Sequence, residues 1–382
     1  MCVYYVNHQK NNMKKFIIYF VVAIILATPA NLSAKRTYES PVAITRVNNN
    51  IVVGVLPQVE LMSIIQTISQ YPNILSFLMA KDSSNYKTDV INHFTPFRNH
   101  PAVKMFDRLS SQPRMLNFSA PTNIMLYTDV NLKLREDIKF DDFVINRAAG
   151  MDSLNLLLDL IRDFAVKSSF NEFYKKHEAF YINIVERTIN NLGSINYVNE
   201  FETFYGKKQK SYNIVLVSLY SSCGYGNSLK CENDMLELFC TIGPRKVINK
   251  SPLFGDPGYL KTMVRHEFSH PFINPLTEKN WDYIKDYSSN YNSIPEMAKK
   301  QVCGDWQECI NEFIIRSITT QLAYNEGDDL GLKTYISEKS NGVIYIDSLL
   351  NKIGYYQLNR DKFPTFESYY LTILDTFKFK SK

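Results

Sequence analysis

Three side chains in the segment VRHEFSHPFINP (Val264 to Pro275) have the types and spacing needed to hold a metal ion: His266, Glu267 and His270. On an α-helix, residues i and i+4 lie on one face about one turn apart, so both imidazoles can point at a common ion. Glu267 lies next to the first imidazole, from where a carboxylate reaches a metal-bound water without coordinating the metal. The pattern therefore predicts a metal centre built on a helix.

This HExxH arrangement is typical of zinc peptidases, in which the ion lowers the pKa of its water toward about 7 and the glutamate accepts the proton. The alternative interpretation is a helix whose histidines satisfy local hydrogen bonds. Burial argues against it, because two imidazoles and a carboxylate on a buried helix need partners or a metal to offset desolvation. The flanking residues that predict burial are Met263, Val264, Phe268, Phe272 and Ile273.

A catalytic zinc site takes three protein ligands and leaves the fourth position to water. No histidine follows His270, which excludes a three-histidine site of the extended HExxH type. The remaining candidates, Glu308 and Glu312, lie one turn apart in DWQECINEFIIRSITTQL. We expect Glu312 to be the ligand, because Asn311-Glu312 followed by Arg316 resembles the helix that supplies the glutamate ligand in gluzincins. Glu308 is then a residue that orients a ligand histidine, and the alternative for this helix is a surface Glu–Arg pair.

The segment HEFSHPFINP, with NEFIIRSI about forty residues later, resembles a family of exported HExxH proteins of Bacteroidota, known as a domain of unknown function and classed with gluzincin-like peptidases. The block VELMSIIQTIS with HFTPFRNHPAV is also similar, so the likeness spans residues 44–377. The resemblance implies a zincin-like catalytic region and a zinc hydrolase, without a substrate. Pro271 departs from the family, which more often has a small polar residue there, and predicts that the helix ends or kinks at this point.

In peptidases of this class, the strand before the metal helix lies at the edge of the sheet and pairs with an extended substrate. We therefore expect Gly224, Tyr225 and Gly226, with the following strand MLELF, to bind the substrate backbone; the alternative is a plain glycine-containing hairpin turn. The reaction also needs a hydrogen-bond donor for the oxyanion. Because no histidine is left for it, we expect a tyrosine and select Tyr324 from four candidates: Tyr259, Tyr283, Tyr287 and Tyr324.

The elements that must position these residues are mainly helical. Patterns with apolar residues three or four apart fill most of the chain before residue 205, after a short hairpin around Asn48 to Asn50. Two apolar, β-branched runs at 212–220 and 235–243 predict neighbouring strands, and helices follow from Asp256-Pro257 and from about Asp305 to Ala323. The predicted fold is α+β, predominantly α-helical, with a small β-sheet preceding the HExxH helix. His93 and His100, far upstream, are expected to pack or to begin a helix.

Residues 1–34 have the layout of a secretory signal peptide, with Lys14 and Lys15 before the apolar run FIIYFVVAIILA and a cleavage site after Ala34. The apolar run is too short to span a membrane. We therefore expect an exported protein, periplasmic or secreted, without a stable membrane anchor. Cleavage removes three lysines and no acid, which takes the formal charge from +5 to +2 and gives no reason to expect a nucleic-acid partner. Residues 35–205 form a mainly helical region and residues 206–382 the catalytic region in this scheme.

Five cysteines follow the leader, and an odd number leaves at least one thiol unpaired. Cys223 is expected to pair with Cys231 or Cys240, whereas a Cys303–Cys309 bond requires a helix to begin between its two residues. No CxxC pair is present, which argues against a cysteine-based zinc site.

The function predicted from these residues is a zinc-dependent metallopeptidase acting on a peptide or protein. Its Zn2+ is bound by His266, His270 and Glu312, and Glu267 is the general base. Two alternatives stay open. One is a catalytically silent exported peptide- or protein-binding protein that retains a structural zinc, and the other is a zinc amidase acting on a non-peptide substrate.

Overall fold

Six strands form a mixed sheet in the computed structural model, which describes residues 38–378 apart from the side chain of residue 301. The predicted signal peptide lies outside the described residues. The sheet order is β1-β2-β4-β6-β5-β3, in which β2, β4 and β6 are parallel while β1, β5 and β3 run antiparallel to their neighbours. The strands are β1 (Ile44–Asn48), β2 (Ile51–Val55), β3 (Ile138–Lys139), β4 (Ser211–Leu216), β5 (Gly224–Cys231) and β6 (Leu236–Ile242). A separate hairpin comprises β7 (Lys246–Ile248) and β8 (Ser251–Leu253).

The hairpin predicted near the N-terminus is present between β1 and β2. Asn49 and Asn50 both have positive φ, at 46° and 67°, which is the backbone that a two-residue hairpin turn requires and that asparagine tolerates. The two runs predicted as neighbouring strands are β4 and β6, which pair in parallel from Ser211 with Glu237 to Leu216 with Ile242. The sequence between them forms a third strand, β5, rather than a loop.

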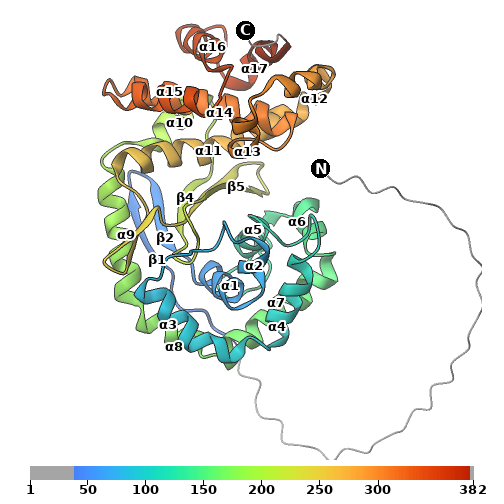
Figure 1. Cartoon of the computed structure of the whole chain (residues 1–382), viewed down its shortest axis with the longest axis vertical. Coiled ribbons are helices and arrows are strands. Elements are labelled where there is room, and N and C mark those ends of the chain that lie inside the picture. Colours follow the sequence, from blue (N-terminus) through green and yellow to red (C-terminus); the bar gives the residue numbers. More distant parts are fainter. Residues whose placement is uncertain (1–37, 379–382) are drawn as a thin grey trace, which may run out of the picture. The chain divides into compact units, whose positions relative to one another are not determined.

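The helices before β4 gather around α1, which packs against α3, α4 and α5 and buries almost every one of its residues (Figure 1). His100 caps α4 by accepting a hydrogen bond from the N–H of Ala102, and His93 bonds to the carbonyl of Ser168, so both histidines have structural roles here. The elements of this part are α1 (Pro57–Ile68), α2 (Tyr71–Ile74), α3 (Asn85–Phe94), η1 (Thr95–Phe97), α4 (Pro101–Ser110), α5 (Ala120–Leu126), α6 (Asp142–Arg147), α7 (Met151–Lys167), α8 (Phe170–Lys176), α9 (Glu178–Leu192) and α10 (Tyr197–Tyr205).

The helices after the sheet are built on α11, which packs against β5 on one side and α14 on the other (Figure 1). These elements are α11 (Pro257–Lys279), α12 (Trp281–Ile284), η2 (Lys285–Ser293), α13 (Glu296–Gln301), α14 (Trp306–Asn325), α15 (Leu330–Ser340), α16 (Ile346–Leu358), α17 (Phe366–Leu374) and η3 (Asp375–Lys378). No helix among residues 38–378 is long and apolar enough to cross a membrane.

Helix α11 begins as predicted, with Asp256 capping the N–H of Tyr259 and Pro257 in the first turn. The helix does not end at Pro271, because one continuous helix runs to Lys279 with Pro271 and Pro275 inside it, and a kink at this proline stays a prediction. Packing beyond the proline holds the last two turns: Phe272 stacks on Tyr205 at 4.0 Å between ring centroids. The hydroxyl of Thr277 also contacts Asn311 and Tyr370.

Cys303 and Cys309 form a disulfide, with Asp305 capping the helix that begins between them at Trp306. The other pairing that we expected is absent, since Cys223, Cys231 and Cys240 are free thiols. Cys223 directly precedes the extended strand β5 and Cys231 ends it, about 26 Å away at 3.3 Å per residue, which a disulfide cannot bridge.

Strands from both predicted regions share the sheet, because β2 pairs in parallel with β4. The described residues also fall into one unit by their contacts. The division near residue 205 stays a prediction.

Candidate metal centre

Helix α11 brings His266 and His270 together on one face, as their spacing predicts. Their Nε2 atoms lie 3.2 Å apart, and each side chain is 17% exposed, so both rings sit at the edge of the interior. With the carboxylate of Glu267, they form a group whose potential ligand atoms all lie within 4.8 Å of one another. This group could hold a metal ion.

Glu312 reaches the same point from α14, which packs along α11. Its Oε2 lies 3.6 Å from Nε2 of His266, and its Oε1 lies 3.5 Å from Nε2 of His270. The alternative ligand, Glu308, is one turn closer to the start of α14 and exposed, where its carboxylate accepts a hydrogen bond from the N–H of Gly304 at 2.8 Å. The structure thus brings Glu312, and not Glu308, to the two histidines.

Further polar residues hold these groups in place. The guanidinium of Arg316 donates to Oε2 of Glu312 at 3.0 Å and to Oε2 of Glu338 on α15 at 2.8 Å. The side-chain oxygen of Asn274 lies 3.3 Å from Nδ1 of His270. If Nδ1 donates to this oxygen, the lone pair of Nε2 is left facing Glu312, as in the ligand orientation common at metal sites.

Sequence reasoning missed two of these partners. Asn274 stands four residues after His270, so helix spacing was the signal that would have found it. Glu338 comes from a separate helix and carries no such signal.

Burial sets the protonation of the two residues at the start of the motif. Loss of solvent raises the pKa of Glu267 to about 7, with the nearby charge of His270 opposing the shift. The pKa of His266 is well below its ordinary value, first because of burial and then because of the positive charges of His270 and Arg316. A neutral imidazole is the form that binds a metal.

Two glycines let strand β5 lie directly against the motif. A Cβ atom on Gly224 would collide with the carboxylate of Glu267 and with Met263. On Gly226 it would collide with the backbone carbonyl of Glu267 and lie 2.9 Å from Cβ of His270. The two predicted glycines therefore adjoin the metal-binding group, on a strand rather than in a turn.

Tyr225 lies between these glycines and so faces the other side of the sheet, where its ring meets Tyr220 at 6.5 Å. Strand β5 pairs with β6 along its inner edge, while its outer edge pairs with β3 only at Lys230 and Cys231. Within the described chain, the outer edge from Gly224 to Leu229 has no strand partner. The strand MLELF, expected to take part in substrate binding, is instead interior, because β6 pairs with β4 and β5.

The structure does not bring Tyr324 to the histidines. It lies twelve residues beyond Glu312 on α14, about 18 Å along the helix, and packs against Gly331. Tyr283 donates to Asp375, and Tyr287 lies near Lys378. Of the four tyrosines considered, Tyr259 is on the motif's own helix, seven residues and hence two turns before His266. Its hydroxyl lies 3.3 Å from that of Ser222.

The fold and site define a mostly helical α+β protein with a candidate His–Glu–His metal site. A family model described as a domain of unknown function (DUF4932) matches residues 51–376, and the chain belongs to this family. Comparison with curated proteins and with solved structures found no match.

Proposed function

We propose that this protein is a zinc-dependent hydrolase that cleaves peptide bonds. One observation carries the proposal. The Nε2 atoms of His266 and His270 and the carboxylate oxygens of Glu312 lie 3.2 to 3.6 Å from one another. Ligands bound tetrahedrally to zinc at 2.0–2.2 Å are spaced by about 3.4 Å. The side chains are therefore already at the separation that one shared ion requires.

The chemistry of the donors also fits zinc. Two imidazoles and one carboxylate form a ligand set used by catalytic zinc sites that leave a position open. The low pKa of His266 keeps its ring neutral, and a cation would offset the burial of the adjacent carboxylates. We assign the three ligand positions to His266, His270 and Glu312.

When bound, zinc supplies a Lewis acid that lowers the pKa of a water molecule. Glu267 accepts the proton from the attacking water and transfers it to the leaving amine. The open edge of β5 beside Gly224 and Gly226 binds the substrate as an added strand. Tyr259 replaces Tyr324 as the proposed oxyanion donor, because it lies on the motif's own helix.

Export to the periplasm or beyond stays part of the proposal. The Cys303–Cys309 disulfide supports it, because such bonds persist in oxidising compartments.

The decisive experiment compares zinc content and hydrolysis in matched variants. Purified wild type should hold one zinc per chain, and Glu312→Ala should lose it. Glu308→Ala, one turn away on the same helix, should keep it. Glu267→Gln should retain zinc but no longer cleave denatured casein. Full cleavage by zinc-loaded Glu267→Gln would contradict the assignment of the general base.

The same assays separate the two alternatives. A zinc-loaded wild type that binds peptides without cleaving any would identify a silent binding protein. Hydrolysis of an acyl amide without cleavage of any peptide would identify a zinc amidase acting on a non-peptide substrate.

A further inference from the structure

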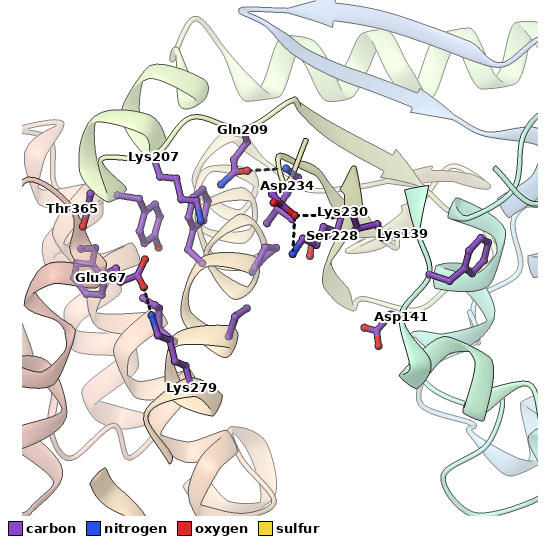
Figure 2. Close-up of a pocket in the computed structure, with 18 of the residues that line it drawn as sticks. Lys139, Asp141, Lys207, Gln209, Ser228, Lys230, Asp234, Lys279, Thr365 and Glu367 are labelled. Carbon is purple, nitrogen blue, oxygen red and sulfur yellow. Dashed lines mark hydrogen bonds and ion pairs between the residues drawn. The ribbon is translucent and has the colours of Figure 1, made fainter. Parts of the chain in front are cut away.

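A cavity of about 490 Å³ is lined in part by residues of β5 and of the second half of α11 (Figure 2). Ser228 and Lys230 of β5 line one part of it, and Pro271 and Phe272 line another. Its volume falls within the range of about 300–1,000 Å³ typical of ligand pockets.

The cavity begins about two strand residues away from the metal site. Pro271 directly follows His270, and Ser228 stands two residues beyond Gly226, about 7 Å along the strand. A peptide lying along β5 with its scissile bond at the histidines therefore passes the mouth of the cavity. Side chains of an extended peptide alternate between faces, so one close to the scissile bond points into it.

The interior surface of the cavity is largely apolar. Aromatic and aliphatic side chains from four parts of the chain supply it: Phe140, Leu236, Phe272, Leu276 and Phe366. Phe272 is fixed by its stack on Tyr205, which also lines the cavity. Such a surface favours a large apolar or aromatic group over a polar one.

Charged groups surround this surface, and three of its four lysines form ion pairs. Lys139 and Lys230 both pair with Asp234, and Lys279 pairs with Glu367 (Figure 2). Lys207, which is exposed, has no ion pair among the described residues. Its ammonium group is therefore available to a carboxylate brought by a ligand.

We propose that this cavity binds a large apolar or aromatic side chain of the substrate, next to an acidic residue that pairs with Lys207. This inference rests on the proposed peptide hydrolysis and adds the class of sequence that is cleaved. A substrate peptide that places phenylalanine in the cavity should have a kcat/KM at least tenfold higher than one that places alanine there.

The test uses three synthetic peptides that are otherwise composed of alanine, serine and glycine. Each carries one central residue pair: Phe-Glu, Ala-Glu or Phe-Lys. Cleavage of each peptide is followed by mass spectrometry with the zinc-loaded protein. Binding is measured separately with zinc-loaded Glu267→Gln by fluorescence anisotropy. We expect the Phe-Glu peptide to bind tightest and to be cleaved fastest, next to the phenylalanine.

Two pairs of variants locate the effect. Leu276→Trp fills the cavity and should abolish the preference for phenylalanine, whereas Leu332→Trp on the exposed face of α15 should not. Lys207→Glu should reverse the preference between Phe-Glu and Phe-Lys. Lys208→Glu, the exposed neighbour that does not line the cavity, should leave it unchanged. The lysine substitutions lie on the surface, so they test the proposal even if Leu276→Trp fails to fold.

The outcomes separate the two proposals. Cleavage without a preference for phenylalanine, or a preference that survives Leu276→Trp, would overturn the assignment of the cavity and leave the hydrolase intact. Absence of cleavage from every peptide and from casein would overturn the proposed peptide hydrolysis. The binding measurements would then still decide whether the cavity selects the Phe-Glu peptide.

Discussion

Arg265 and Glu200 form a two-point ion pair directly behind the metal-binding motif. The Nε and a terminal nitrogen of the guanidinium donate to the two carboxylate oxygens at 2.9 and 2.7 Å, and the Arg265 side chain is completely buried. Its remaining nitrogen lies 2.6 Å from a carboxylate oxygen of Glu326 near the end of α14. Because Arg265 precedes His266, these pairs fix the rotation of α11 about its axis.

Replacing Arg265 by methionine should strongly destabilise the protein. The change leaves Glu200 without its cation and Glu326 with Lys261 as its remaining partner, and breaking such a buried pair costs on the order of 3–5 kcal/mol of unfolding free energy. Urea denaturation measures the loss. Lys279→Met, which removes the exposed pair with Glu367, should cost less than about 1 kcal/mol. Equal losses for the two variants would refute the role given to Arg265.

Replacing Glu338 by glutamine should weaken zinc binding without unfolding the protein. Glu338 holds Arg316, which in turn holds Glu312, and loss of such a supporting group typically lowers metal affinity about 10- to 100-fold. Competition with a coloured zinc chelator measures the affinity. Asp347→Asn, which breaks an exposed pair with Lys339, is the control and should bind zinc as the wild type does. A wild-type affinity for Glu338→Gln would exclude the positioning role.

Stability should depend on pH through Glu60, which is buried on α1 and accepts a hydrogen bond from Tyr86 at 2.6 Å. Burial raises the pKa of Glu60 from 4.5 to about 7 in the folded protein. The folded state therefore holds this proton more tightly than the unfolded state. The resulting stabilisation is complete below pH 4.5 and is lost as the pH rises through 7, a change on the order of 3 kcal/mol.

Glu60→Gln should remove this contribution, so the variant should gain stability over the wild type as the pH is raised from 4.5 to 8. Denaturation curves across that range measure the difference. The exposed substitution Glu232→Gln should keep the pH dependence of the wild type. Parallel curves for Glu60→Gln and the wild type would contradict the prediction.

Replacing Gly226 by alanine should disturb the metal centre, because the added methyl group meets the backbone of Glu267 and Cβ of His270. Such overpacking costs about 1–3 kcal/mol, and zinc content should fall with stability. Gly354→Ala on α16 is the matched control, since its methyl group meets nothing within 4 Å. There the substitution should stabilise the helix by about 0.5–1 kcal/mol. Calorimetric unfolding with zinc analysis distinguishes the two.

Local spacing explains how much of the site was predictable. His266 and His270 meet because four residues make about one helical turn, and the cap at Asp256 follows from its sequence. The expectation of a helix end at Pro271 failed because packing of the following turns outweighs one missing backbone bond. Helix propensity reflects only the local sequence, whereas the packing that holds these turns comes from elements distant in sequence.

Residue spacing could not predict which residues reach the site from other helices. Glu312 was selected by its resemblance to a gluzincin helix, not from geometry, and its distances to the histidines come from the packing of α14 on α11. Glu338 and Glu200 reach the site from separate helices. Tyr324 is one of four tyrosine candidates that no spacing to the motif distinguishes, and its helix carries it away from the histidines.

Pro271 has no N–H to bond to the carbonyl of Glu267, and that oxygen lies against Gly226 of β5. On this side of the cavity, the main chain of α11 lies directly against the main chain of β5, with no side chain between them that could change rotamer. This wall of the cavity is therefore rigid. Adaptation to substrates of different bulk falls to the opposite side of the cavity, at Phe140 and Asp141 between β3 and α6.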